Sequence, residues 1–95
     1  MSKNTVTQEQ IDALMASAIF ESVTAAGKCT IVVAALQNGF VLVESSSCVD
    51  PENYDIEIGH KICMKKIEDK LWELEGYALQ KKLYEEMQHE TDRSI

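Results

Sequence analysis

The sequence predicts one α+β domain: an N-terminal helix, a two-stranded antiparallel β-hairpin, and two C-terminal helices or one long helix bent near Gly76. A chain of 95 residues that is 45% hydrophobic has room for a single core. Apolar residues recur at helical spacing before about residue 25 and after residue 55, and a β-branched stretch separates these regions. We therefore treat 1–95 as one domain, with flexible ends at 1–6 and 90–95.

The first predicted helix begins at a capping box. Thr7 and Gln10 are three residues apart, so the Thr7 hydroxyl can accept from the Gln10 backbone N–H while the Gln10 side chain reaches back. Apolar or small residues then recur at three- and four-residue steps, namely Ile11, Leu14, Met15, Ala18, Ile19 and Ser22. This spacing predicts a helix of about 17 residues that ends near Gly27.

The predicted hairpin turns at Asn38-Gly39. The runs 29–36 and 40–44 are rich in β-branched residues, and Asn-Gly suits a type I′ turn because both residues tolerate positive φ. A two-residue loop places Gln37 opposite Phe40, and the same register places Cys29 opposite Cys48. Both faces of this hairpin are apolar. One helical layer covers one face, so we expect a second subunit at the other face or at the open edges.

The C-terminal part begins with two alternative helix caps, Asp50 before Pro51 and Asp55. One stripe predicts the core face, formed by Ile56, His60, Cys63, Met64, Ile67, Leu71 and Leu74. A second apolar set points elsewhere, which predicts either a break near Gly76 or a helix that offers its second stripe to another chain. We therefore expect a homo-oligomer, a dimer or larger, with these interface candidates: Phe40, Leu42, Ile58, Ile62, Trp72, Leu79 and Leu83.

Four residues form a conceivable zinc site, because thiolates and imidazoles are ligands that Zn²⁺ prefers: Cys29, Cys48, His60 and Cys63. Their spacing lacks a C-x-x-C pair, and Cys63 falls on the apolar stripe, so the sequence favours core packing over metal binding. The sequence also lacks the nucleophile, phosphate-loop and zinc-protease motifs. We expect no catalytic residues, no cofactor and no enzymatic activity.

The net charge of −7 argues against nucleic-acid binding. No apolar run is long enough to span a membrane, and the N-terminus lacks the apolar core of a signal peptide, so we expect a cytoplasmic protein. A few lysines and aromatic residues could still line a ligand pocket near one helix end. The candidates are Tyr54, Lys61, Lys65 and Trp72.

Short blocks at characteristic spacing run through most of the chain: Asn38-Gly39-Phe40, Glu44-Ser45, Cys48-Val49-Asp50-Pro51, Asn53-Tyr54-Asp55, Glu57-Ile58-Gly59 and Trp72-x-Leu74-Glu75-Gly76-Tyr77-x-Leu79. They resemble a family of small tailed-phage and prophage proteins of unknown function, the gp-forty-nine-like family. The resemblance implies expression in the cytoplasm of an infected bacterium, and it implies no catalytic or binding residues.

Three hypotheses of function follow. The first is a non-enzymatic oligomeric interaction module that modulates a host bacterial protein during infection. The second is an oligomer that sequesters a nucleotide-type host defence signal in a pocket between subunits. The third, weaker hypothesis is a Cys/His metal-binding domain.

Overall fold

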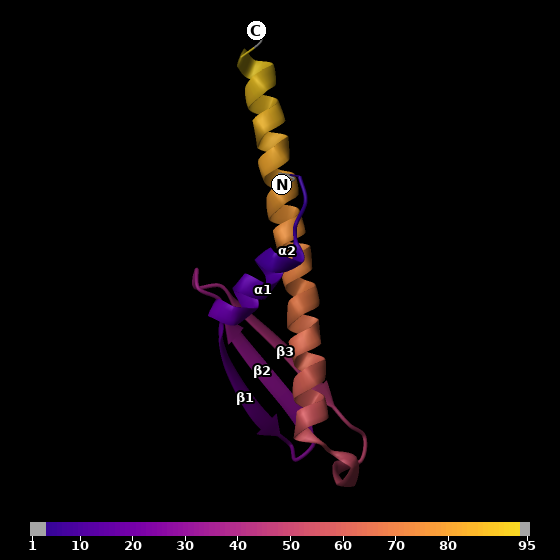
Figure 1. Cartoon of the computed structure of the whole chain (residues 1–95). Helices are drawn as coiled ribbons and strands as arrows, with labels where there is room; N and C mark the ends of the chain where they lie inside the picture. The colour runs from indigo at the N-terminus through magenta and orange to yellow at the C-terminus, as the bar shows by residue number, and fades with distance from the viewer. Residues whose placement is uncertain (1–3, 94–95) are drawn as a thin grey trace.

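The computed structural model describes the backbone of residues 4–93 and the side chains of residues 4–88. Its elements follow the order α1 (Gln8–Ser17), β1 (Ile19–Ala25), β2 (Cys29–Ala35), β3 (Val41–Ser47), the short 3₁₀ helix η1 (Pro51–Asn53) and α2 (Ile56–Arg93) (Figure 1). The α+β class is thus confirmed. Of the predicted flexible ends, residues 1–3 and 94–95 lie outside the described residues, whereas 90–93 continue α2.

The prediction of a two-stranded hairpin is wrong, because the sheet has three antiparallel strands in the order β1-β2-β3. The first helix ends at Ser17, and residues 19–25 form β1 instead of about two further helical turns. All seven residues of β1 pair with β2, from Ile19 opposite Ala35 to Ala25 opposite Cys29. Their β-branched and aromatic side chains favour a strand, and pairing along a full strand outweighs the weak helical spacing.

The predicted register of the hairpin that turns at Asn38-Gly39, which joins β2 to β3, is also wrong by one residue. The loop contains three residues, Gln37, Asn38 and Gly39, and Gly39 adopts a positive φ of 95°. The Leu36 N–H donates to the Phe40 carbonyl at 2.8 Å, which closes this longer loop. Ser47 therefore lies opposite Cys29. Because side chains alternate along a strand, a shift of one residue exchanges the faces on which the β3 side chains lie.

Helix α2 continues without a break through Gly76, so of the two predicted alternatives the break into two C-terminal helices is wrong and the helix that runs on is found. A glycine inside a helix costs only about 1 kcal/mol, and the sequence supplies neither proline nor a cap to end the helix there. Asp55 caps α2 by accepting from the Glu57 N–H at 2.9 Å, while Asp50 caps η1 by accepting from the Glu52 N–H at 3.0 Å. Each of the two alternative caps thus begins its own helix.

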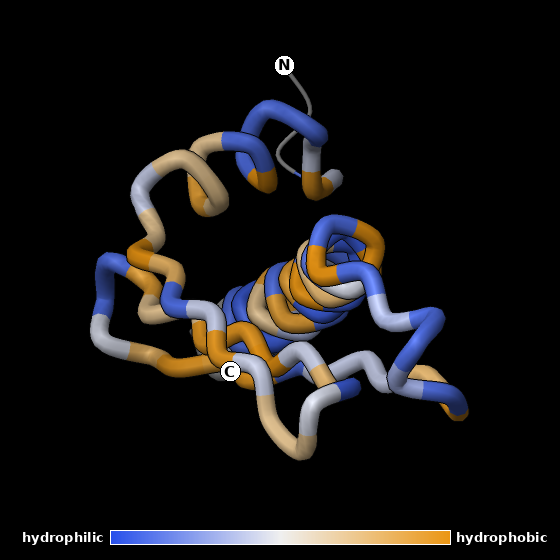
Figure 2. Tube along the Cα trace, turned by 90° about the horizontal axis from the view of Figure 1, so that it is seen from below, coloured by the Kyte–Doolittle hydropathy of each residue, from blue (hydrophilic) through white to orange (hydrophobic). Residues whose placement is uncertain are grey.

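The core lies between one face of the sheet and the two helices. Helix α2 crosses β2 and β3, and α1 packs on α2 near the end of the sheet (Figure 1). Figure 2 looks nearly along α2 and shows hydrophobic stretches of the strands beside it. The buried apolar residues are Ile11, Val32, Ala34, Leu42, Cys63, Ile67 and Leu71. Of the predicted core stripe, Cys63, Ile67 and Leu71 are buried, whereas Ile56 remains 50% exposed at the start of α2.

The molecule is elongated because α2 is much longer than the sheet. Its 38 residues correspond to roughly 57 Å of helix, and the described chain extends over 67 × 22 × 20 Å. The C-terminal part of α2 projects beyond the sheet and α1 (Figure 1).

Candidate functional site

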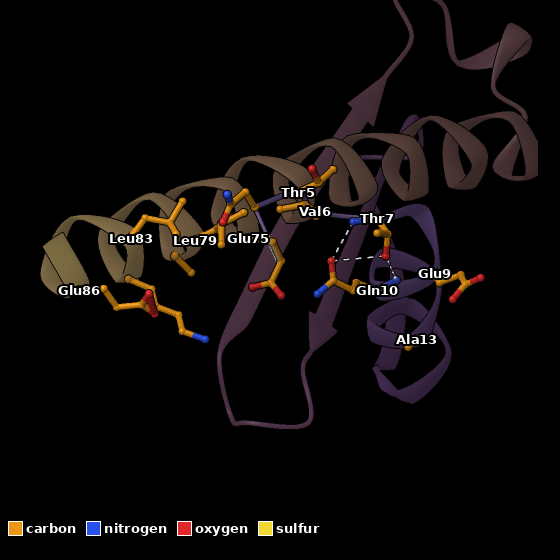
Figure 3. Close-up of a pocket in the computed structure, with 13 residues that line it drawn as sticks. Thr5, Val6, Thr7, Glu9, Gln10, Ala13, Glu75, Leu79, Leu83 and Glu86 are labelled. Atoms are coloured by element: carbon orange, nitrogen blue, oxygen red, sulfur yellow. Dashed lines mark hydrogen bonds between the residues drawn. The ribbon is translucent and has the colours of Figure 1, made fainter. Parts of the chain in front are cut away.

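A groove of about 1030 Å³ lies between α2 and the N-terminal part of the chain. Its floor is the side of α2 that carries Leu79 and Leu83, and its wall is formed by residues 4–7 and the first turns of α1 (Figure 3). Both leucines are half-buried, as is Val6 on the opposite wall. The groove therefore combines an apolar floor with a partly apolar wall.

The capping box fixes the wall of this groove. The Gln10 N–H donates to Thr7 Oγ1 at 3.2 Å, and the Thr7 N–H donates to Gln10 Oε1 at 2.8 Å (Figure 3). These are the two reciprocal bonds predicted from the sequence. Gln8 then links α1 to α2, because its Nε2 donates to Glu68 Oε2 at 3.1 Å. Helix packing and these bonds together hold the N-terminal segment beside α2.

Charged side chains lie along the rim of the groove. Glu9, Glu75 and Glu86 contribute carboxylates, and Lys82 contributes an ammonium group. Glu75 and Glu86 project from the same side of α2 as the two floor leucines (Figure 3). The rim is therefore mainly negative, with one positive position between two acids of α2.

A second surface is the face of the sheet turned away from α2. Residues directly opposite one another in the strands share this face, and apolar side chains predominate: Ile19, Val23, Ala25, Ile31, Val33, Ala35, Val41 and Val43. Ile19 is 70% exposed and Val43 is 56% exposed. Glu21 is the one charged residue that the pairing places on this face. We call this set of eight residues the open sheet face.

Sequence reasoning missed three of the eight residues of this surface because it assigned 19–25 to a helix. The signal was residue type, because Ile19, Phe20, Val23 and Thr24 are β-branched or aromatic residues that favour strands. It also missed the N-terminal segment as a wall of the groove, for which the sequence offers only the capping box.

The predicted interface residues are distributed over several surfaces. Leu42 is only 8% exposed and lies in the core beneath α2, so it is not available to a partner. Phe40, Ile58 and Ile62 are exposed by 41% or more. Leu79 and Leu83 form the groove floor, and Trp72 packs against the edge of the core.

The four residues of the predicted ligand pocket lie away from this groove. None of Tyr54, Lys61, Lys65 and Trp72 lines the groove. The Lys65 ammonium pairs with Asp69 at 2.9 Å, and this hydrogen bond raises the pKa of Lys65. The Tyr54 hydroxyl is bound to two strand threonines, 2.6 Å from Thr30 Oγ1 and 3.0 Å from Thr24 Oγ1.

The cysteines and His60 do not form a metal site of three or more ligands. Among residues 4–93, as far as the side chains are described, no three His, Cys, Asp or Glu side chains gather around a common point. Cys48 lies beyond Ser47, and the corrected register removes it from its predicted place opposite Cys29. Cys63 is fully buried, and its Sγ lies 3.6 Å from the Thr30 carbonyl oxygen. Burial raises the pKa of the Cys63 thiol, which keeps it neutral.

Within the described part of the chain, no helix is long and apolar enough to cross a membrane. No curated protein and no solved structure matches the chain significantly. A family model matches residues 6–83, from the N-terminal wall of the groove to the second leucine of its floor. The chain therefore belongs to the phage protein (N4 Gp49/phage Sf6 gene 66) family.

Proposed function

We propose that this phage protein is a non-enzymatic, self-associating interaction module that modulates a host bacterial protein during infection. The observation that carries the proposal is the open sheet face. Eight apolar residues on three paired strands lie away from the core, and Ile19, Val23, Val41 and Val43 are each more than half exposed. A contiguous apolar surface of this kind is typical of protein interaction sites.

A second copy of the chain is the occupant that the charges favour. The chain carries a net charge of −7, so two copies repel each other across most of their surfaces. The open sheet face holds a single acid, Glu21, on the edge strand β1, where it can remain in water when two sheets meet. Association through this face therefore buries apolar side chains without burying a cluster of like charges.

We propose that the host protein binds a different surface, the acidic segment at the start of α2. Asp50, Glu52, Asp55 and Glu57 are all exposed within eight consecutive residues. Asp50 and Asp55 are engaged as helix caps, whereas Glu52 and Glu57 have no such role. Acidic groups of this kind are complementary to a basic patch on a partner protein and accelerate its association.

The experiment combines two measurements on the full chain. Light scattering gives the oligomeric mass, which we expect to exceed that of one chain and to fall in Val43→Asp. A pull-down from infected cells is expected to return one reproducible host protein. Its recovery should decrease with Glu52→Gln/Glu57→Gln and remain unchanged with Glu73→Gln/Glu85→Gln, acids placed elsewhere on α2. A monomeric protein that recovers nothing reproducible contradicts the proposal.

A second candidate is an oligomer that sequesters a nucleotide-type host defence signal, and the volume of the groove within each chain favours it. About 1030 Å³ is close to the upper end of small-molecule sites. The rim opposes an anionic ligand, since it holds three carboxylates and the single ammonium of Lys82. Thermal-shift measurements with cyclic and ADP-ribose-type nucleotides test this candidate. A melting temperature that no compound changes rules it out.

A further inference from the structure

The part of α2 that projects beyond the sheet carries a second apolar stripe. Trp72, Gly76, Leu79, Leu83 and Met87 recur at steps of four and three residues, which places them within about 80° around the helix. Trp72 packs against the edge of the core, and beyond it the stripe points away from the core side of α2, where Met87 is 68% exposed. Packing of an apolar stripe supplies most of the stability of a helix in a protein, so Leu79 and Leu83 are candidate contacts for a second chain.

The open sheet face alone is small for a stable interface. Its three strands of seven residues span a patch of only roughly 14 × 24 Å, so an interface of standard size, which buries about 800 Å² of accessible surface on each partner, extends beyond the sheet. An oligomer of this chain therefore needs a second contact surface. The stripe of α2 and the adjoining groove are available on a different side of the molecule.

The charges beside the stripe identify the occupant. Lys82 and Glu86 both border the groove, on the same side of Leu79 and Leu83. When two α2 helices pack antiparallel around a twofold axis near Tyr84, each Lys82 lies alongside Glu86 of the partner subunit. In a parallel pair, opposite flanks of the stripe meet, so Lys82 would not lie alongside Glu86 of the partner subunit. The surface is thus self-complementary for an antiparallel copy.

We propose that α2 of a second copy lies antiparallel in the groove, with its stripe on Leu79 and Leu83 and with two symmetric ion pairs between Lys82 and Glu86 of the partner subunit. This inference rests on the self-association proposed above and names its second contact. Val6 and Ala13 on the groove wall would flank the incoming helix. The protruding half of α2 then becomes part of a helical layer shared by two chains.

Charge reversal tests this contact on the full chain. Lys82→Glu or Glu86→Lys alone places like charges together twice in each pair of helices, so we expect association to weaken about tenfold. An equimolar mixture of the two variants restores opposite charges at both contacts, and native mass spectrometry should show the mixed species in excess. The controls are Lys81→Glu and Glu85→Lys, which have the same four-residue spacing but lie on the opposite side of α2. They should leave the oligomer unchanged, and circular dichroism should show the same helix content in all variants.

The outcomes separate this inference from the function on which it rests. A wild-type oligomer that responds equally to Lys82→Glu and Lys81→Glu, with no excess of mixed species, overturns the antiparallel contact alone. A wild-type protein that is monomeric at every concentration overturns both proposals. A monomer whose melting temperature rises with a nucleotide assigns the groove to a small ligand instead.

Discussion

The Tyr54 hydroxyl lies 2.6 Å from Oγ1 of Thr30, a side chain with no exposure to solvent. The same hydroxyl lies 3.0 Å from Oγ1 of Thr24 on the neighbouring strand. This small network fastens the loop before α2 to β1 and β2. It also satisfies the buried polar side chain in the sheet, so that a threonine is tolerated where an apolar residue would otherwise be expected.

Tyr54→Phe is expected to lower the free energy of unfolding by about 1–3 kcal/mol, because Thr30 Oγ1 loses its partner while it stays buried. Urea denaturation measures the effect. Tyr84→Phe is the matched control, since the Tyr84 hydroxyl accepts an exposed bond from Gln88 at 3.1 Å. That change should cost less than about 0.5 kcal/mol. In a Thr30→Val background the cost of Tyr54→Phe should shrink, and equal costs in both backgrounds would contradict the role of the network.

Gly59→Ala is expected to be the most damaging glycine substitution in α2. A Cβ at this position would lie 2.9 Å from Cβ of Thr30, which is closer than real Cβ contacts come. Helix α2 would have to move away from β2, and overpacking of a core costs about 1–3 kcal/mol or more. Thermal or urea unfolding measures the loss, and loss of soluble protein would have the same meaning.

Gly76→Ala, on the same helix, is expected to stabilise the protein. No atom outside the local helix lies within 4 Å of a Cβ built at Gly76. Alanine should therefore stabilise the helix by up to about 1 kcal/mol, because glycine has more backbone freedom to lose. If Gly59→Ala and Gly76→Ala both lowered or both raised the free energy of unfolding, the close packing of Gly59 against Thr30 would not account for the results.

The three cysteines should differ in reactivity. Cys63 is fully buried and burial raises the pKa of its thiol, whereas Cys29 and Cys48 are partly exposed. Because the thiolate is the reactive form, iodoacetamide should modify Cys29 and Cys48 in the folded protein and reach Cys63 only in urea. Mass spectrometry of digested protein locates the labels. Equal labelling of all three under native conditions would contradict the burial of Cys63.

The same pKa shift predicts a dependence of stability on pH. A thiol whose pKa is raised in the folded state holds its proton after the unfolded thiol, with an ordinary pKa of 9.0, has lost it. The folded state then binds more protons, so the free energy of unfolding falls as the pH rises above about 9. Cys63→Ala should remove this part of the decrease, which urea titrations of both proteins at pH 8 and pH 10 would measure.

The sequence predicted local features whose cause is also local. The capping box at Thr7 and the caps at Asp50 and Asp55 depend on residues two or three positions away, and the structure confirms them. The core stripe through Cys63, Ile67 and Leu71 follows from helical periodicity alone. Such features can be predicted without knowing which residues far apart in the sequence are in contact.

The errors concern choices that distant partners decide. Residues 19–25 fit a helical stripe about as well as a strand, and their pairing with β2 settles the choice. The hairpin register depends on whether the loop has two or three residues, which changes the face of Leu42. Whether α2 continues through Gly76 depends on the small cost of one glycine in a long helix. The groove depends on how the N-terminal segment packs, so the sequence could not indicate it.

The turn between β1 and β2 offers a site for stabilisation. Ala26 adopts a φ of 54° and Gly27 a φ of 70°, so two successive residues occupy the left-handed region. An alanine in this region costs roughly 1 kcal/mol or more, because its Cβ approaches the following carbonyl oxygen. Asparagine tolerates the region better. Ala26→Asn should therefore raise the free energy of unfolding by about 0.5–1 kcal/mol. Gly27→Ala should lower it, although no atom lies within 4 Å of the added Cβ, because the backbone conformation alone is unfavourable. Urea denaturation of the two variants beside the wild type checks both signs, and a destabilised Ala26→Asn would mean that this turn does not hold its two positive φ angles in solution.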